Sequence, residues 1–213
     1  MRRTEILIGG QGGQGVLELG NYIAYQALAG GKHVACTPSY GPESRGGRVK
    51  CFVVISDGII DSPIVEHPDY LIAMNIQSME FVQKLVPGGT LLMNSSLIEY
   101  EAERKDVAVF RVPATGIAAG IARSGHYGKQ DTRIAANCVM LGCYLEISNG
   151  SADDSDLEAV FDHFLKGNKS RFVPVNMEAA RLGRAYAMRM KSAGTMMPRY
   201  DRGLENVLSM RNR

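Results

Sequence analysis

The residues with the clearest chemical potential lie in two glycine-rich segments. The first runs from Gly9 to Gly15 as Gly-Gly-Gln-Gly-Gly-Gln-Gly, and the second runs from Tyr40 to Gly47 as Tyr-Gly-Pro-Glu-Ser-Arg-Gly-Gly. Each follows a short β-like run, and glycine at this density lets the backbone adopt positive φ angles and approach a ligand or another chain closely. Two such loops at the same ends of neighbouring strands would face one site.

In the first segment, Gly10, Gly12 and Gly15 have the spacing of the dinucleotide-binding fingerprint, with a strand before them and a helix after them. Backbone N–H groups and the positive end of that helix could hold a phosphate. A nicotinamide enzyme also needs an acid after its second strand, where this chain has Cys36-Thr37-Pro38, and no P-loop lysine follows Gly15. The alternative is a tight turn whose glycines pack against a neighbouring subunit.

In the second segment, Pro42 fixes the backbone, and Glu43, Arg45 and Arg48 place charges of both signs within six residues. Arg45 or Arg48 could form bidentate hydrogen bonds to a carboxylate or phosphate, and Glu43 could orient them or pair across an interface. The alternative is a solvated salt-bridge cluster, which would not need this concentration of glycine, proline and tyrosine.

The remaining sequence does not assemble a catalytic or metal site. The four histidines have no short metal-binding spacing, and no Ser-His-Asp elbow, HExxH motif or paired-carboxylate arrangement is present. The cysteines lack zinc or iron–sulfur spacings, so we expect them to be reduced, buried and structural: Cys36, Cys51, Cys138 and Cys143. We therefore predict no catalytic and no metal-binding residue, and we expect any metal centre to lie on another chain.

Strand-like and helix-like patterns that must position these loops alternate over the first 150 residues. Ser56-Asp57-Gly58 reads as a turn, with Ile59-Ile60 returning as a hairpin partner. Asn137 falls inside an apolar helix, where it needs a hydrogen-bonding partner. The pattern predicts an α/β, Rossmann-like layered fold with a mixed, mostly parallel sheet and helices on both faces. Strands are expected near 5–8, 33–36, 49–55, 70–73, 90–93 and 107–110, and helices after Val16 and near 78–86, 132–147 and 155–165.

Charge separates the end of the chain from the rest. The formal net charge is +2, but residues 171–213 carry nine basic and three acidic side chains. We predict a domain over 1–170 and a basic helical extension over 171–213, with a helix that starts near Pro174 and a segment beyond Gly194 that orders against a partner. The basic charge indicates docking to an acidic surface or a solvated helix. This segment lacks the dense block of basic residues with interleaved aromatic residues that would indicate binding to nucleic acid.

No apolar stretch approaches the roughly 20 residues of a membrane span. Met1-Arg2-Arg3 leads directly into the first strand without a signal-peptide core. We therefore expect a cytoplasmic protein without a membrane partner.

With these residues in view, the chain resembles the gamma subunit of 2-oxoacid:ferredoxin oxidoreductases over roughly residues 4–150. The resemblance implies a part in thiamine-diphosphate-dependent oxidative decarboxylation of a 2-oxoacid, with coenzyme A accepting the acyl group and ferredoxin the electrons, or in the reverse carboxylation. The Ser-Tyr-Gly-Pro-Glu run is more similar to the 2-oxoglutarate branch than to the pyruvate branch. The similar segments are Gly9 to Val16, Ser39 to Gly47, Val54 to Asp57, Ile60-Asp61, Pro68 to Met74, Gly88-Gly89 and the helix of Asn137.

The resemblance also implies where the cofactors and partners lie. Thiamine diphosphate and Mg²⁺ belong to the alpha and beta subunits, and the iron–sulfur clusters to other subunits such as a ferredoxin-like delta chain. The isolated chain is then expected to be inactive, with its loops at the interface near the route of coenzyme A. The residues implied to contact the coenzyme or the adjoining subunit are Gly10, Gln11, Gly12, Gly13, Gln14, Gly15, Ser39, Tyr40, Gly41, Glu43, Arg45, Gly46 and Gly47.

Two other classes of protein stay open. A free-standing nucleotide-binding or sensor module would bind NAD, FAD or an adenine nucleotide without a catalytic partner, although the missing acid after the second strand counts against it. A purely structural subunit would be needed for assembly and would bind no ligand.

Overall fold

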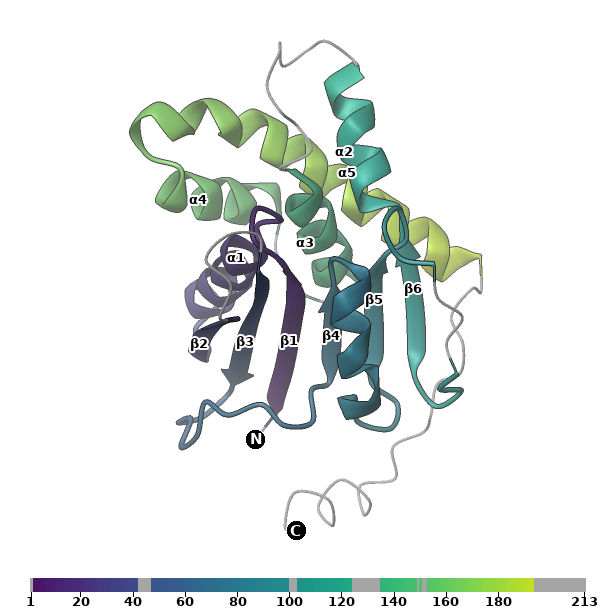
Figure 1. Ribbon diagram of the computed structural model, residues 1–213. Helices are drawn as coiled ribbons and strands as arrows, with labels where there is room; N and C mark the ends of the chain where they lie inside the picture. Colours follow the sequence, from purple (N-terminus) through teal and green to yellow (C-terminus); the bar gives the residue numbers. More distant parts are fainter. Residues whose placement is uncertain are drawn as a thin grey trace.

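A six-stranded sheet lies at the centre of the computed structural model, which describes residues 2–41, 47–99, 103–123, 135–148, 150 and 153–193 (Figure 1). Its strands follow the order β2-β3-β1-β4-β5-β6. β1, β4, β5 and β6 pair in parallel, and β3 pairs antiparallel with both β1 and β2. Among the described strands β3 alone is reversed, so the predicted mixed, mostly parallel sheet is confirmed. The strands are β1 (Arg3–Gln11), β2 (His33–Tyr40), β3 (Arg48–Ser56), β4 (Tyr70–Ala73), β5 (Thr90–Asn94) and β6 (Ala108–Val112).

The antiparallel part of the sheet is β3, which pairs with β1 on one side and with β2 on the other, so the hairpin predicted at Ile59-Ile60 is wrong. Ser56 at the end of β3 lies between Arg3 of β1 and His33 of β2. Both edges of β3 are therefore occupied along its length, and no backbone groups remain for Ile59-Ile60 to pair with. The turn signal at 56–58 is local, whereas the occupation of both edges depends on distant strands.

Helices cover both faces of the sheet, as predicted. The η1 helix lies in front of β4 and β5, while α1 and α3 lie behind the sheet (Figure 1). Strand side chains alternate accordingly: Ile6 and Ile8 join the core under α1 and α3, and Leu7 joins the core under η1. The helices are α1 (Val16–Ala29), η1 (Ile76–Lys84), α2 (Ala114–Arg123), α3 (Ala136–Ile147), α4 (Asp154–Phe164), η3 (Gly167–Phe172) and α5 (Val173–Ser192).

Local sequence explains most of these helices. Asp153 accepts a hydrogen bond from the backbone of Asp156, whose side chain accepts one from the backbone of Asp153, which forms a capping box at the start of α4. The segment predicted near 78–86 is a 3₁₀ helix, capped by the side chain of Asn75. α2 was not predicted, because its many alanine and glycine residues give a weak apolar pattern.

The basic C-terminal helix α5 packs against α3 within the main core. Pro174 occupies its first turn, as predicted. Gly142 and Gly183 let the helices touch: a Cβ on Gly142 would overlap the carbonyl oxygen of Ala180, and one on Gly183 would overlap that of Val139. The domain boundary at residue 171 stays a prediction, and the extension beyond Gly194 lies outside the described residues.

Replacing the glycine at this contact tests the helix packing. Gly183→Ala should destabilise the fold by about 1–3 kcal/mol, because α5 must move away from α3 to accommodate one methyl group. Urea unfolding measures the change. Gly120→Ala in α2 is the matched control, since its Cβ would lie 4.0 Å from the nearest atom of Arg123 and helix propensity favours alanine by about 1 kcal/mol. Equal midpoints for the two variants would contradict the close α3–α5 contact.

Candidate functional site

The two glycine-rich segments meet at the carboxyl end of β1. The sheet register places Gln11 opposite Arg48, so both segments leave the sheet at one edge. The backbone N–H of Gly12 donates a hydrogen bond to the carbonyl oxygen of Gly47 over 3.0 Å, and the N–H of Gly41 donates to the carbonyl of Arg48 over 2.7 Å. The expectation that the two loops lie at the same end of neighbouring strands is therefore confirmed for their described residues, and their role as a site stays a prediction.

The side chain of Gln14 fixes the shape of the first loop. Its Oε1 accepts a hydrogen bond from the backbone N–H of Gln11 over 2.8 Å, and its Nε2 donates to the carbonyl of Met74 over 3.3 Å. The backbone N–H of Gln14 also donates to the carbonyl of Gln11 over 3.1 Å. One side chain thus closes the turn and ties it to the end of β4.

Gly9 and Gly10 are needed for packing inside the chain. A Cβ on Gly9 would lie 2.7 Å from Oγ of Ser78, and one on Gly10 would lie 2.6 Å from Cγ2 of Val16. These distances are too short for any side chain without displacement of its neighbours. The alternative that these glycines pack against a neighbouring subunit is therefore unnecessary at these two positions.

Gly15 and Asn137 form a contact between α1 and α3. Gly15 is the N-cap residue of α1 with φ 71°, and its Cβ position is occupied by the amide of Asn137. Asn137 is buried, donates from Nδ2 to the carbonyl of Gly15 over 3.3 Å, and accepts from the N–H of Cys138 at Oδ1 over 2.8 Å. The predicted need for a polar partner is confirmed, and that partner is the glycine loop.

Gly13 lies at the open tip of the loop. Its φ is 92°, and a Cβ there would meet no described atom within 4 Å. Among the described residues no backbone carbonyl accepts a hydrogen bond from the N–H of Gly13, and Val16 and Leu17 lie in the first turn of α1, where N–H groups have no acceptor within the helix. Free N–H groups and the positive end of α1 are the groups that hold a phosphate or carboxylate oxygen.

The second loop is described only at its two ends. Ser39 and Gly41 are half-buried, and Tyr40 is exposed with 66% of its surface accessible. Arg48, one of the two arginines considered as an anion ligand, forms an exposed ion pair with Glu80 over 3.2 Å. Glu43, Arg45 and Gly46 lie outside the described residues, so their roles remain predictions.

Two buried asparagines at the carboxyl edge of the sheet were not predicted from the sequence. Asn94, at the end of β5, donates from Nδ2 to Thr115 Oγ1 over 2.9 Å and to the carbonyl of Met74 over 3.4 Å. Asn75, after β4, accepts hydrogen bonds from the backbone and hydroxyl of Ser78. Both follow directly on apolar strands, and that position is the signal that could have indicated them.

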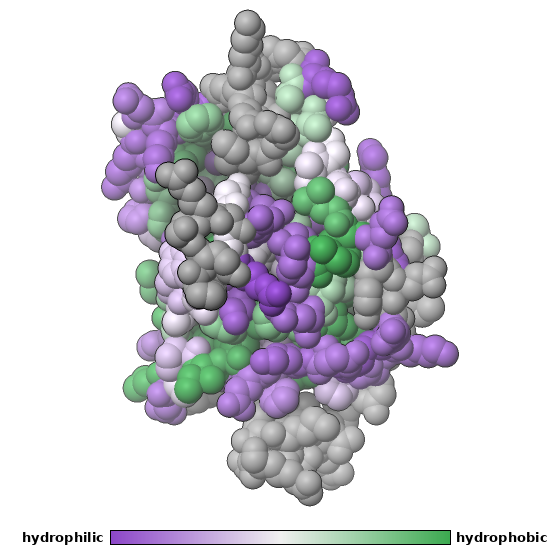
Figure 2. Space-filling model, viewed as in Figure 1, coloured by the Kyte–Doolittle hydropathy of each residue, from purple (hydrophilic) through white to green (hydrophobic). Residues whose placement is uncertain are grey.

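Exposed apolar side chains surround the loops. Tyr40, Ile76 and Leu97 follow or end β2, β4 and β5 and keep about half or more of their surface accessible. Figure 2 shows an apolar patch over the first turn of η1, beside hydrophilic side chains in front of β1. An apolar patch next to polar groups is typical of a surface that another chain covers.

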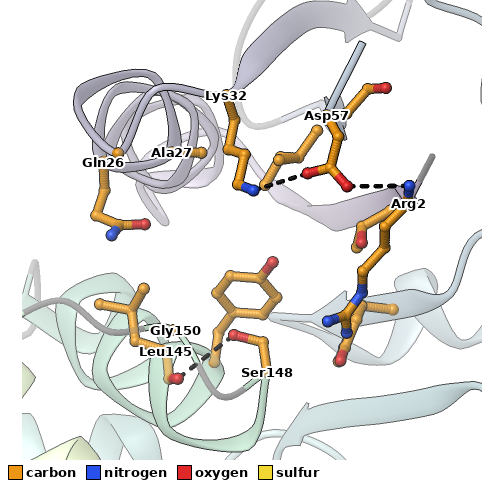
Figure 3. Close-up of a pocket in the computed structure, with 14 residues that line it drawn as sticks. Arg2, Gln26, Ala27, Lys32, Asp57, Leu145, Ser148 and Gly150 are labelled. Carbon is orange, nitrogen blue, oxygen red and sulfur yellow. Dashed lines mark hydrogen bonds and ion pairs between the residues drawn. The ribbon is translucent and has the colours of Figure 1, made fainter.

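A separate pocket of about 230 Å³ lies at the opposite, amino end of β1, between the carboxyl ends of α1 and α3 (Figure 3). There the ammonium of Lys32 donates a hydrogen bond to Oδ1 of Asp57 over 2.7 Å, and the backbone N–H of Arg2 donates one to Oδ2 of Asp57 over 3.1 Å. The hydrogen bond from Lys32, followed by that from Arg2, lowers the pKa of Asp57. These contacts tie chain segments together and do not belong to the glycine-loop site.

The described ranges contain neither a cluster of metal ligands nor a membrane-spanning helix. No three His, Cys, Asp or Glu side chains gather there as a metal site would require. Each helix in those ranges is too short or too polar to cross a lipid bilayer.

Comparison with known proteins identifies the class. Residues 5–186 match the pyruvate ferredoxin/flavodoxin oxidoreductase family. The chain therefore belongs to this family, and the resemblance to gamma subunits of 2-oxoacid:ferredoxin oxidoreductases is confirmed. The fold of the gamma subunit of a keto/oxoacid ferredoxin oxidoreductase from Geobacter sulfurreducens PCA is similar, with a TM-score of 0.67, 27% identity and coverage of 87% of this chain and 99% of that chain.

The similar curated proteins differ in length. The 2-oxoglutarate synthase subunit KorC of Methanothermobacter marburgensis is 36% identical over 193 residues, which cover 87% of this chain and 97% of KorC. The ketoisovalerate oxidoreductase subunit VorA of Methanothermobacter thermautotrophicus is 35% identical over 186 residues, which cover 86% of this chain. This chain spans only 36% of VorA.

A larger enzyme shares the fold. The 2-oxoglutarate:ferredoxin oxidoreductase of Magnetococcus marinus, solved with 2-oxoglutarate, coenzyme A and succinyl-CoA bound, matches with a TM-score of 0.76 and 23% identity. The match covers 89% of this chain and 32% of that chain. At this identity the likeness concerns the fold alone.

Alanine at two glycines separates backbone strain from the Asn137 contact. Gly13→Ala and Gly15→Ala both force alanine into a positive φ, which costs about 1–2 kcal/mol. Gly15→Ala should cost on the order of 1–3 kcal/mol more, because its methyl group also displaces Asn137. Urea unfolding of both variants measures the difference.

A double variant checks the cause. Asn137→Ala in the Gly15→Ala background should recover part of the lost stability, because it removes the overlapping amide. Strictly additive losses would show that Asn137 does not support the loop.

Proposed function

We propose that this chain is the gamma subunit of a multisubunit 2-oxoacid:ferredoxin oxidoreductase. Such a complex oxidatively decarboxylates a 2-oxoacid to acyl-CoA and CO₂ with thiamine diphosphate and passes the electrons to ferredoxin. The observation that carries the proposal is the hydrogen bond between Gly12 and Gly47, which joins two glycine loops at one edge of the sheet. The partners are alpha and beta subunits and a ferredoxin-like delta subunit, in the cytoplasm.

In this proposal the chain contacts coenzyme A and the adjoining subunit but catalyses no step by itself. The N–H groups of Gly13, Val16 and Leu17 and the positive end of α1 suit a coenzyme phosphate. Tyr40, Ile76 and Leu97 offer apolar surface to the adjoining subunit around it. Arg45 and Glu43, beyond the described residues, complete the proposed contact.

Thiamine diphosphate, Mg²⁺ and the iron–sulfur clusters belong to partner subunits in this proposal. We propose 2-oxoglutarate as the substrate, since the relatives matched along nearly their full length are named 2-oxoglutarate synthase subunits. The VorA proteins make a branched-chain 2-oxoacid the competing substrate.

Purification under anaerobic conditions tests the proposal. The tagged chain from its native host should bring down thiamine- and iron–sulfur-binding proteins, with coenzyme A-dependent reduction of ferredoxin that is fastest with 2-oxoglutarate. Pyruvate and 2-oxoisovalerate are the comparison substrates. A chain recovered alone that binds NAD, FAD or an adenine nucleotide would instead identify a free-standing nucleotide-binding module.

A charge at the loop tip separates a coenzyme contact from a purely structural subunit. In the active complex, Gly13→Asp should raise the KM for coenzyme A roughly tenfold or more, because hydrogen bonds to a charged group contribute about 1.5–3 kcal/mol and the new carboxylate repels phosphate. Steady-state kinetics with varied coenzyme A measure the effect.

The matched control is Gly167→Asp. Gly167 also has a positive φ, 61°, with no described atom within 4 Å of its Cβ position, but it lies in η3. Gly167→Asp should leave the KM for coenzyme A unchanged.

Arg45→Ala should raise the coenzyme A requirement without loss of assembly. Unchanged kinetics in both Gly13→Asp and Arg45→Ala would leave the chain as a structural subunit.

A further inference from the structure

Two cysteines face each other across the β2–β3 hairpin. The Sγ atoms of Cys36 and Cys51 lie 3.4 Å apart, although the residues belong to different strands. The register pairs Cys36 with Val53 and Pro38 with Cys51, so the two cysteines are diagonal neighbours on one face. The expectation that all four cysteines are buried is wrong for Cys36, which is half-buried because β2 is an edge strand.

The two thiols differ in access. Cys51 is 1% exposed and packs under α1, where a Cβ on Gly20 would overlap its sulfur. Cys36 lies on the edge strand β2 and keeps part of its surface accessible, and its Sγ lies 3.6 Å from Oδ1 of Asn21. An external reagent therefore meets Cys36 first, with Cys51 directly behind it.

The contact between the two thiols also shifts their pKa values in opposite directions. The hydrogen bond between the two thiols lowers the pKa of Cys36 against the opposing effect of burial. The same bond, together with burial, raises the pKa of Cys51. Since the thiolate is the nucleophile, Cys36 is suited to attack and Cys51 to resolve the product.

We propose that Cys36 and Cys51 are a redox-active dithiol that closes into a disulfide between β2 and β3 on reaction with an external disulfide, either a small thiol compound or a redox protein. The Cys36 sulfur attacks one sulfur of the external disulfide and releases the first thiol. Cys51 then loses its proton, attacks the Cys36 sulfur of the mixed disulfide and releases the second thiol. Two S–H bonds are oxidised and one external disulfide is reduced to two thiols.

Closure of this disulfide moves β2 and β3, the two strands between which the second glycine loop lies in the sequence. Diagonal neighbours have Cα atoms about 7–8 Å apart. A disulfide holds Cα atoms about 4.4–6.8 Å apart, and paired strands already lie about 4.8 Å apart, so closure requires β2 and β3 to slide along each other. The hairpin that shifts carries Tyr40 and Gly47, which hold the two ends of that loop. The dithiol itself does not depend on the proposed function, whereas an effect of oxidation on turnover rests on it.

Mass spectrometry of the intact chain tests the dithiol directly. The reduced chain is incubated without oxygen in oxidised glutathione, and the remaining thiols are alkylated. We expect the mass before alkylation to fall by two hydrogen atoms, and only two of the four thiols to remain for the alkylating reagent. Trypsin cuts after Lys32, Arg45 and Lys50, so a peptide of residues 33–45 should be linked to one that begins at Cys51.

Three variants assign the roles. Cys51→Ser should stop at a glutathione mixed disulfide on Cys36, and Cys36→Ser should leave Cys51 unmodified. Cys138→Ala, which alters a buried thiol elsewhere in the core, should close the Cys36–Cys51 disulfide as the wild type does. Thermal melting checks that each variant is folded. Loss of all four thiols at one rate, or no linked peptide under any oxidised-to-reduced ratio, would overturn the proposal.

Turnover of the complex tests the link to activity. The oxidised complex should show a raised KM for coenzyme A that dithiothreitol reverses, and the Cys36→Ser complex should not respond to oxidised glutathione. A linked peptide together with unchanged turnover would overturn the link to activity while the dithiol stands. Absence of any active complex would count against the proposed function alone, because the mass measurement needs only this chain.

Discussion

The hydrogen bond from the Gly12 amide to the Gly47 carbonyl is the interaction on which the site depends. It joins the loop after β1 to the hairpin loop between β2 and β3, and it forms because β3 runs antiparallel between β1 and β2. The reversed strand therefore brings together two loops that the order of the sequence keeps apart.

A polar network extends this constraint along the carboxyl edge of the sheet. The carbonyl of Met74 accepts hydrogen bonds from both Gln14 and Asn94, and Asn94 also contacts Thr115 at the start of α2. Buried polar groups that are all paired hold their elements in one arrangement. The hydrogen-bonded edge of the sheet is therefore rigid, while Gly13 at the tip of the first loop stays exposed. A preorganised contact requires such an accessible group on a rigid support.

The packing behind the sheet supports the same loop. Gly142 and Gly183 bring α5 against α3, and α3 presents Asn137 to the carbonyl of Gly15. A change at the α3–α5 contact can therefore reach the glycine loop through one helix. The basic helix α5 is therefore linked to the first glycine loop only indirectly, through α3.

The sequence by itself determined the α/β class, most strands and helices, both glycine loops and the family, because these depend on local periodicity and on residue types in order. Tertiary structure alone decided the partner of β3, the meeting of Cys36 with Cys51, and the burial of Asn94 beside Met74. The turn pattern at residues 56–58 carries no information about whether other strands already pair with both edges of β3. Pairing between distant residues is a property of the packed sheet, and no local pattern records it.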